Sequence, residues 1–195
     1  MLTTELREER EVLAQFVREH VAMPIGQFRE RHPHPFLLME SGQAVTAEET
    51  GYQTAIVGAE RPVALFAPEQ ASAIPEARRR VLLLPVTRAP RSPQARRITV
   101  GRSSMNDLVL RFDQVSKIHA YFVPREHGPG LALVDAGSTN GTTVNGVRLV
   151  PDERIDVFDG DEIEFGPGLP FAFLATDTLH WYLGTLARRL GLPHR

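Results

Sequence analysis

Short apolar segments separated by turn residues fill the sequence from residue 81 to residue 174. Gly, Asn, Asp, Ser and Pro stand in the gaps, where their backbone preferences favour turns. We expect strands at residues 81–84, 98–100, 108–110, 120–123, 131–134, 143–144, 155–157, 162–165 and 171–174. Short strands at this spacing are typical of a β-sandwich.

Basic and small polar residues gather at the turns between these strands. Arg102 is a rigid fork of donors that can hold two oxygens of a phosphate at once. Lys117, the only lysine in the chain, adds a second cation, and the hydroxyls of Ser116 and Thr139 can donate to further oxygens. Asn140 offers a donor and an acceptor to a peptide backbone. Together these residue types predict a site for a phosphate-sized anion.

A purely structural interpretation exists for each turn taken singly. The segments 138–142 and 144–146 both contain Asn-Gly, the strongest short signal for a β-hairpin turn. The set taken together, in its order along the chain, favours a binding site.

The ordered set resembles the forkhead-associated (FHA) domain, a module that binds phosphothreonine peptides. The resemblance covers about residues 80–175 and is carried by Gly101-Arg102, residues 115–120, residues 135–142, residues 144–146 and the closing segment 159–166. It implies a mainly β fold: a sandwich of two antiparallel sheets, with an N-terminal helix and short strands before it and a C-terminal helix after it.

The resemblance also implies roles for individual residues. Phosphate contacts fall on Arg102, Ser116, Lys117 and Thr139, and peptide contacts on Gln114, Asn140 and Asn145. Gln114 departs from the family, which often has a basic residue at this position. Structural support falls on Gly101, His119 and Gly141. His119 could instead be a general base, but a lone histidine without a partner nucleophile carries no chemistry.

Three domains are expected along the chain: an N-terminal extension at 1–78, the FHA-like domain at 79–176 and a C-terminal helix at 177–195. In the extension we expect a helix at 4–21 ended by Pro24, strands at 36–39, 54–57 and 62–66, and a linker at 67–79. The last helix should span about 177–190, with Asp177 as its cap.

Composition narrows the function. The 195 residues include 42% hydrophobic residues and no cysteine, and the net charge is −2. The hydrophobic content allows a real core, and the absence of cysteine rules out disulfides. The slightly negative net charge argues against a nucleic-acid polycation. With neither a membrane-length apolar run nor a secretory signal in view, we expect a cytoplasmic protein.

We expect no enzyme, cofactor or metal. The sequence contains no Gly-x-x-x-x-Gly-Lys, His-Glu-x-x-His or Gly-x-Ser-x-Gly motif, and His32 and His34 have no nearby third ligand. The expected partner is a phosphothreonine-containing protein, such as a Ser/Thr kinase or its substrate. The alternative is an FHA-shaped scaffold that binds a partner without phosphate.

Overall fold

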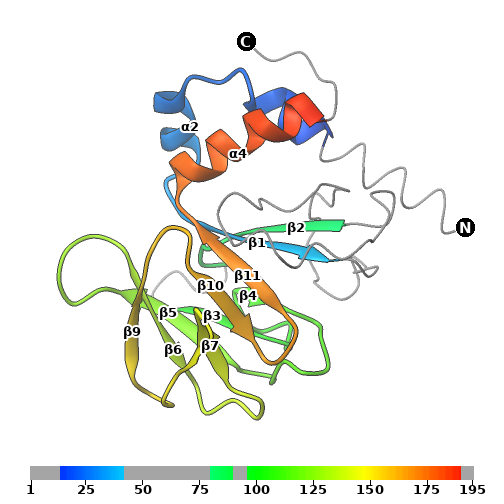
Figure 1. Ribbon diagram of the computed structural model, residues 1–195. Helices are drawn as coiled ribbons and strands as arrows, with labels where there is room; N and C mark the ends of the chain where they lie inside the picture. Colours follow the sequence, from blue (N-terminus) through cyan, green and yellow to red (C-terminus); the bar gives the residue numbers. More distant parts are fainter. Residues whose placement is uncertain (1–13, 42–79, 90–95, 190–195) are drawn as a thin grey trace, which may run out of the picture.

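The computed structural model describes residues 14–41, 80–89 and 96–189. Two β-sheets pack face to face, and helices cover one end of the resulting sandwich (Figure 1). The fold class is therefore mainly β with small N- and C-terminal helices, as the sequence predicts.

The first sheet has six strands in the order β2-β1-β11-β10-β7-β8. Its strands are β1 (Phe36–Ser41), β2 (Arg80–Pro85), β7 (Thr142–Val144), β8 (Val147–Arg148), β10 (Glu162–Phe165) and β11 (Pro170–Leu174). The second sheet has five strands in the order β4-β3-β5-β6-β9. Its strands are β3 (Ile98–Gly101), β4 (Leu108–Val109), β5 (Ala120–Pro124), β6 (Leu131–Asp135) and β9 (Arg154–Val157).

The main core lies between the two sheets. Alternate residues of each strand point inward, as in β5, where Ala120 and Phe122 are buried and Tyr121 is half-buried. Phe122 stacks on Phe173 of the opposite sheet, with 6.0 Å between ring centroids. Burial of these large side chains is the main stabilising contribution to the sandwich.

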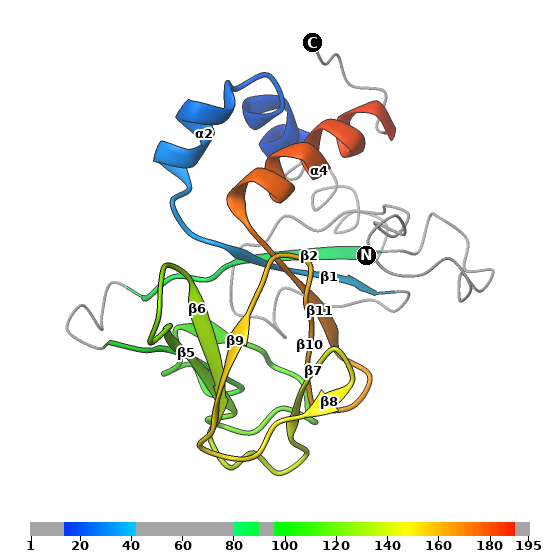
Figure 2. The same ribbon diagram turned by 60° about the vertical axis from the view of Figure 1, so that its left-hand side comes forward.

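A second, smaller core joins the sheet to the helices. It contains residues of the helical segment 14–20, of α2 (Ile25–Arg31) and of α4 (Thr176–Arg189). Figure 2 shows these helices together on the outer side of β1. Phe36 and Leu38 face this helical cluster, whereas Leu37 and Met39 face the sandwich core. From Phe36 to Met39, strand β1 is thus buried on both faces, which explains the four consecutive apolar residues there.

Strand β1 lies inside the six-stranded sheet, between β2 and β11, and pairs antiparallel with both. The expected boundary between residues 78 and 79 therefore falls between two hydrogen-bonded strands of one sheet.

Local differences from the expected elements have simple causes. The first helix ends at residue 20, close to the expected end at residue 21, and its predicted start lies outside the described residues. Pro24 is the N-cap of α2, and its carbonyl accepts a hydrogen bond from the Phe28 N–H at 3.0 Å. The second sheet is mixed, because β4 pairs parallel to β3. Strand β8 was not predicted, because its two residues are both exposed and include no buried apolar run. The expected strands at 54–57 and 62–66 and the linker at 67–79 lie outside the described residues.

Asp177 is not a helix cap. It lies in the first turn of α4 and receives two hydrogen bonds from the Arg29 guanidinium, at 2.8 and 2.6 Å. Both side chains are more than half exposed, so this pair orients α2 against α4 rather than supplying much stability.

None of the described helices is long and apolar enough to cross a membrane. The described residues also include no group of three or more His, Cys, Asp or Glu side chains placed to hold a metal ion.

We expect Leu37→Ala to destabilise the whole sandwich by about 2–5 kcal/mol, because the fully buried Leu37 side chain fills the space between the sheets. Urea denaturation followed by tryptophan fluorescence and circular dichroism measures the change. Val147→Ala is the control, since Val147 is 69% exposed. Similar unfolding free energies for the two variants would mean that β1 is not part of the core.

Candidate functional site

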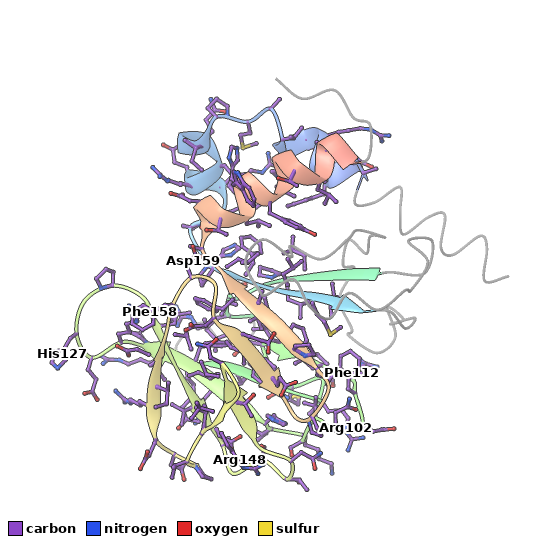
Figure 3. All side chains as sticks on the ribbon, viewed as in Figure 1. Arg102, Phe112, His127, Arg148, Phe158 and Asp159 are labelled. Carbon is purple, nitrogen blue, oxygen red and sulfur yellow. The ribbon has the colours of Figure 1, made fainter. Side chains whose placement is uncertain are left out.

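Three loops meet at the end of the sandwich away from the helices. They follow β3, precede β5 and follow β6. In Figure 3, Arg102 and Arg148 mark this end, whereas Phe158 and Asp159 lie nearer the helices. Each loop adjoins a different strand of the second sheet. The order of strands in this sheet therefore brings the expected site residues together.

The loop after β3 is fastened to the loop before β5 through main-chain atoms. The Arg102 N–H donates to the Ser116 carbonyl at 2.8 Å, and the Ser103 N–H donates to the Lys117 carbonyl at 3.1 Å. A Cβ at Gly101 would lie 2.5 Å from the Lys117 carbonyl oxygen. Only glycine therefore permits this close approach.

Arg102 is exposed and anchored at one point. Its Nε donates to the Val115 carbonyl at 3.2 Å. Among the described residues, its two terminal nitrogens have no hydrogen-bond partner. The guanidinium is thus held in place while its fork remains available to an anion.

Ser116 and Thr139 bring two hydroxyls together. The Thr139 N–H donates to Ser116 Oγ at 3.0 Å, and the two hydroxyl oxygens are 3.3 Å apart. A hydroxyl hydrogen rotates to suit its acceptor, so both groups can turn toward a bound oxyanion.

Asn140 is held from two sides. Its side-chain Nδ2 donates to the main-chain carbonyl of Gln114 at 2.8 Å, and the main-chain carbonyl of Asn140 accepts a hydrogen bond from Arg148 Nη1 at 2.9 Å. Gln114 thus contributes its main chain to the site, and this contact does not depend on its side chain. Among the described residues, the side-chain oxygen of Asn140 has no partner, so it can accept an N–H from a peptide.

His119 lies fully buried beneath the loops. Its Nδ1 accepts the Ser116 N–H at 3.0 Å, so the ring hydrogen must be on Nε2, which donates to the Gly141 carbonyl at 3.2 Å. Burial lowers the pKa of His119 below its usual 6.5, although the Gly141 contact and the charge of Asp135 oppose this shift. His119 is therefore a neutral brace between two loops.

Asp135, at the end of β6, ties the third loop into a compact turn. Its carboxylate accepts from the Ser138 N–H at 2.8 Å, the Ser138 hydroxyl at 2.7 Å and the Thr142 hydroxyl at 2.6 Å. Burial alone would raise the pKa of Asp135, but these hydrogen bonds outweigh it and the pKa is lowered. The Ser138 hydroxyl oxygen in turn accepts the Gly141 N–H at 2.9 Å, which completes the turn.

Gly141 adopts a positive φ of 84° and packs closely against a neighbour. A Cβ there would lie 2.4 Å from Cζ of Arg148. Any other residue would have to adopt a strained backbone and displace this guanidinium.

The side chain of Asn145 contacts the segment around β10 and not the three loops. Its Nδ2 donates to Asp161 at 2.9 Å, and its Oδ1 accepts the Glu162 N–H at 2.9 Å. Both polar atoms of the side chain are thereby used to hold the β7–β8 hairpin against β10, and the expected peptide contact by Asn145 stays a prediction. Arg148, by contrast, was not anticipated from the sequence, since only the folded hairpin brings it to Asn140.

Part of the chain is similar to known proteins. Residues 98–166 match the family model of the FHA domain. Human Kanadaptin is 36% identical over 75 residues, which are 34% of this chain and 10% of Kanadaptin. The chain thus spans about a tenth of that relative.

Two proteins of known structure also match part of this chain. EmbR of Mycobacterium tuberculosis, in complex with a low-affinity phosphopeptide, is 32% identical, with 42% of this chain and 20% of that chain covered and a TM-score of 0.36. The N-terminal FHA domain of Rad53p from S. cerevisiae, in complex with a phosphothreonine peptide, is 29% identical, with 44% and 73% covered and a TM-score of 0.38.

The lowered pKa of His119 has a consequence for stability. Since the unfolded chain takes up a proton at about pH 6.5, the stabilisation by neutral His119 is fully present above that pH and is lost as the pH falls toward the folded pKa. We expect the unfolding free energy of His119→Gln to vary less between pH 7 and 5 than that of the native protein. The two slopes should differ by at most about 1.4 kcal/mol per pH unit.

Urea denaturation at a series of pH values measures this slope. The pKa values of His32 and His34 are also lowered, chiefly by burial, so only the difference between the protein and its variant reports on His119. His127→Gln, at an exposed loop position, is the control and should keep the full slope. An unchanged slope in His119→Gln would contradict the assigned protonation state.

Proposed function

We propose that residues 98–166, which match the family model of the FHA domain, bind phosphothreonine peptides through Arg102, Ser116, Lys117 and Thr139. The observation that carries the proposal is the convergence of an available guanidinium and two adjacent hydroxyls on three loops that are fixed from below. The complexes of EmbR with a phosphopeptide and of Rad53p with a phosphothreonine peptide support this ligand class.

The phosphate would be held mainly by charge-assisted hydrogen bonds. Arg102 supplies a fork that matches two phosphate oxygens, and the hydroxyls of Ser116 and Thr139 donate to the remaining oxygen. Lys117 is exposed, and its carbonyl accepts the N–H of Ser103, the residue after Arg102. Its charge adds positive potential near the site, which speeds the encounter with an anionic peptide.

The peptide main chain would be held by Asn140. Its Nδ2 is committed to Gln114, so its side-chain oxygen is directed to accept an N–H of the ligand. A main-chain contact fixes the position of the peptide without dependence on its sequence. Gln114 and Asn145 are further candidate peptide contacts, the first through an adjacent main-chain carbonyl.

Binding involves no catalysis in this proposal. The imidazole of His119 uses both nitrogens on loop backbone and is fully buried, so it cannot act as a general base. The role is that of a non-catalytic module in Ser/Thr kinase signalling, with a kinase or a kinase substrate in the cytoplasm as the partner. A scaffold that binds without phosphate is the alternative function.

We expect Arg102→Ala to abolish measurable phosphopeptide binding while the domain remains folded. Loss of a bidentate charge-assisted pair costs about 2–5 kcal/mol of binding free energy. Calorimetric titration with a phosphothreonine peptide and its unphosphorylated counterpart measures this loss. Arg31→Ala on α2 removes the same charge far from the site and serves as the control. Unchanged affinity in Arg102→Ala would refute the site, and equal affinity for both peptides would favour the scaffold.

Ser116→Ala and Thr139→Ala should each weaken binding less than Arg102→Ala does. Each removes one hydrogen bond to a charged acceptor, worth about 1.5–3 kcal/mol. His119→Ala should lower the melting temperature instead, because it leaves the Ser116 N–H and Gly141 carbonyl without their partner. The same titration and a thermal melt of each variant separate these effects. Intact stability with lost binding in His119→Ala would reverse the assigned roles.

A further inference from the structure

Arg148 lies beside the loop that holds Thr139 and Asn140. It belongs to β8, which pairs with β7 through Thr143 at the edge of the six-stranded sheet. Its Nη1 donates to the Asn140 carbonyl at 2.9 Å, and its Cζ packs against Gly141. The hydrogen bond and the packing together fix the guanidinium next to the residue assigned to the peptide main chain.

The charge of Arg148 is not neutralised within the described part of the chain. Arg148 is exposed and forms no ion pair there. Asp135, the carboxylate nearest in sequence to this loop, directs its oxygens to Ser138 and Thr142 and is buried. Only one of the five N–H donors of Arg148 is used on Asn140, so the others can hold an anionic group outside the protein.

We propose that Arg148 selects phosphopeptides that carry Asp or Glu beside the phosphothreonine. This inference rests on the proposed function, since Asn140 must hold the peptide main chain for a neighbouring peptide side chain to come within reach of Arg148. The planar fork of a guanidinium matches the two oxygens of a carboxylate, whereas the amide of Asn or Gln gives only a neutral hydrogen bond. Arg148 is thus a specificity-determining residue, distinct from the phosphate contacts.

The test uses the full chain and matched phosphothreonine peptides. Each pair differs by Asp against Asn, or Glu against Gln, at one position flanking the phosphothreonine. We expect the acidic peptide to bind the native protein about two- to fivefold more tightly at one of these positions. Arg148→Gln should remove this preference, and Arg148→Lys, which keeps the charge but not the fork, should retain only part of it.

Arg31→Gln is the matched control, because it removes one exposed positive charge from α2 at the opposite end of the molecule. It should keep the full preference. The inference is overturned if the native protein has no preference at any position, or if Arg148→Gln keeps it. A uniform loss of affinity for all phosphopeptides in Arg148→Gln, with the preference unchanged, would make Arg148 only a support for Asn140. If phosphorylated and unphosphorylated peptides bind equally, the proposed function fails as well.

Discussion

The neutral imidazole of His119 is the contact on which the binding loops depend. One nitrogen accepts an N–H from the loop before β5, and the other donates to the carbonyl of Gly141 in the loop after β6. The main chain of His119 adds hydrogen bonds to Val100 and Ala136. A single buried residue thereby joins β3 and the two loops, and the ring also meets Phe165 edge-on in the core. Because His119 is packed in the core, its hydrogen bonds restrain the loops that carry the hydroxyls of Ser116 and Thr139.

The turn held by Asp135 complements this brace. Its three hydrogen bonds, from Ser138 and Thr142, hold the turn on both sides of Thr139, and Arg148 fixes the carbonyl of Asn140. A site built in this manner loses little conformational entropy when a ligand binds, since its donors are already positioned.

The sequence predicted those features that depend on local residue types. Short apolar segments between turn residues predicted the strands. The Gly-Arg, Ser-x-x-His and Thr-Asn-Gly segments, through their family resemblance, predicted residues that the fold brings together. The position of β1 could not be predicted, because its partners β2 and β11 lie far away in the chain and its apolar run suits several environments. Arg148 also escaped prediction, because its contact with Asn140 depends on the fold of the β7–β8 hairpin.

The helices and the binding loops occupy opposite ends of one cooperative unit. Strand β1 contributes Leu37 to the sandwich core and Leu38 to the helical core, so neither core can lose β1 and remain intact. Asp159 strengthens this connection, because it accepts hydrogen bonds from the Ala175 N–H and the Thr178 hydroxyl at the start of α4. The helical segments thus extend and stabilise the sheet from the far end. They leave the loops around Arg102 and Arg148 exposed, as the proposed recognition of a peptide requires.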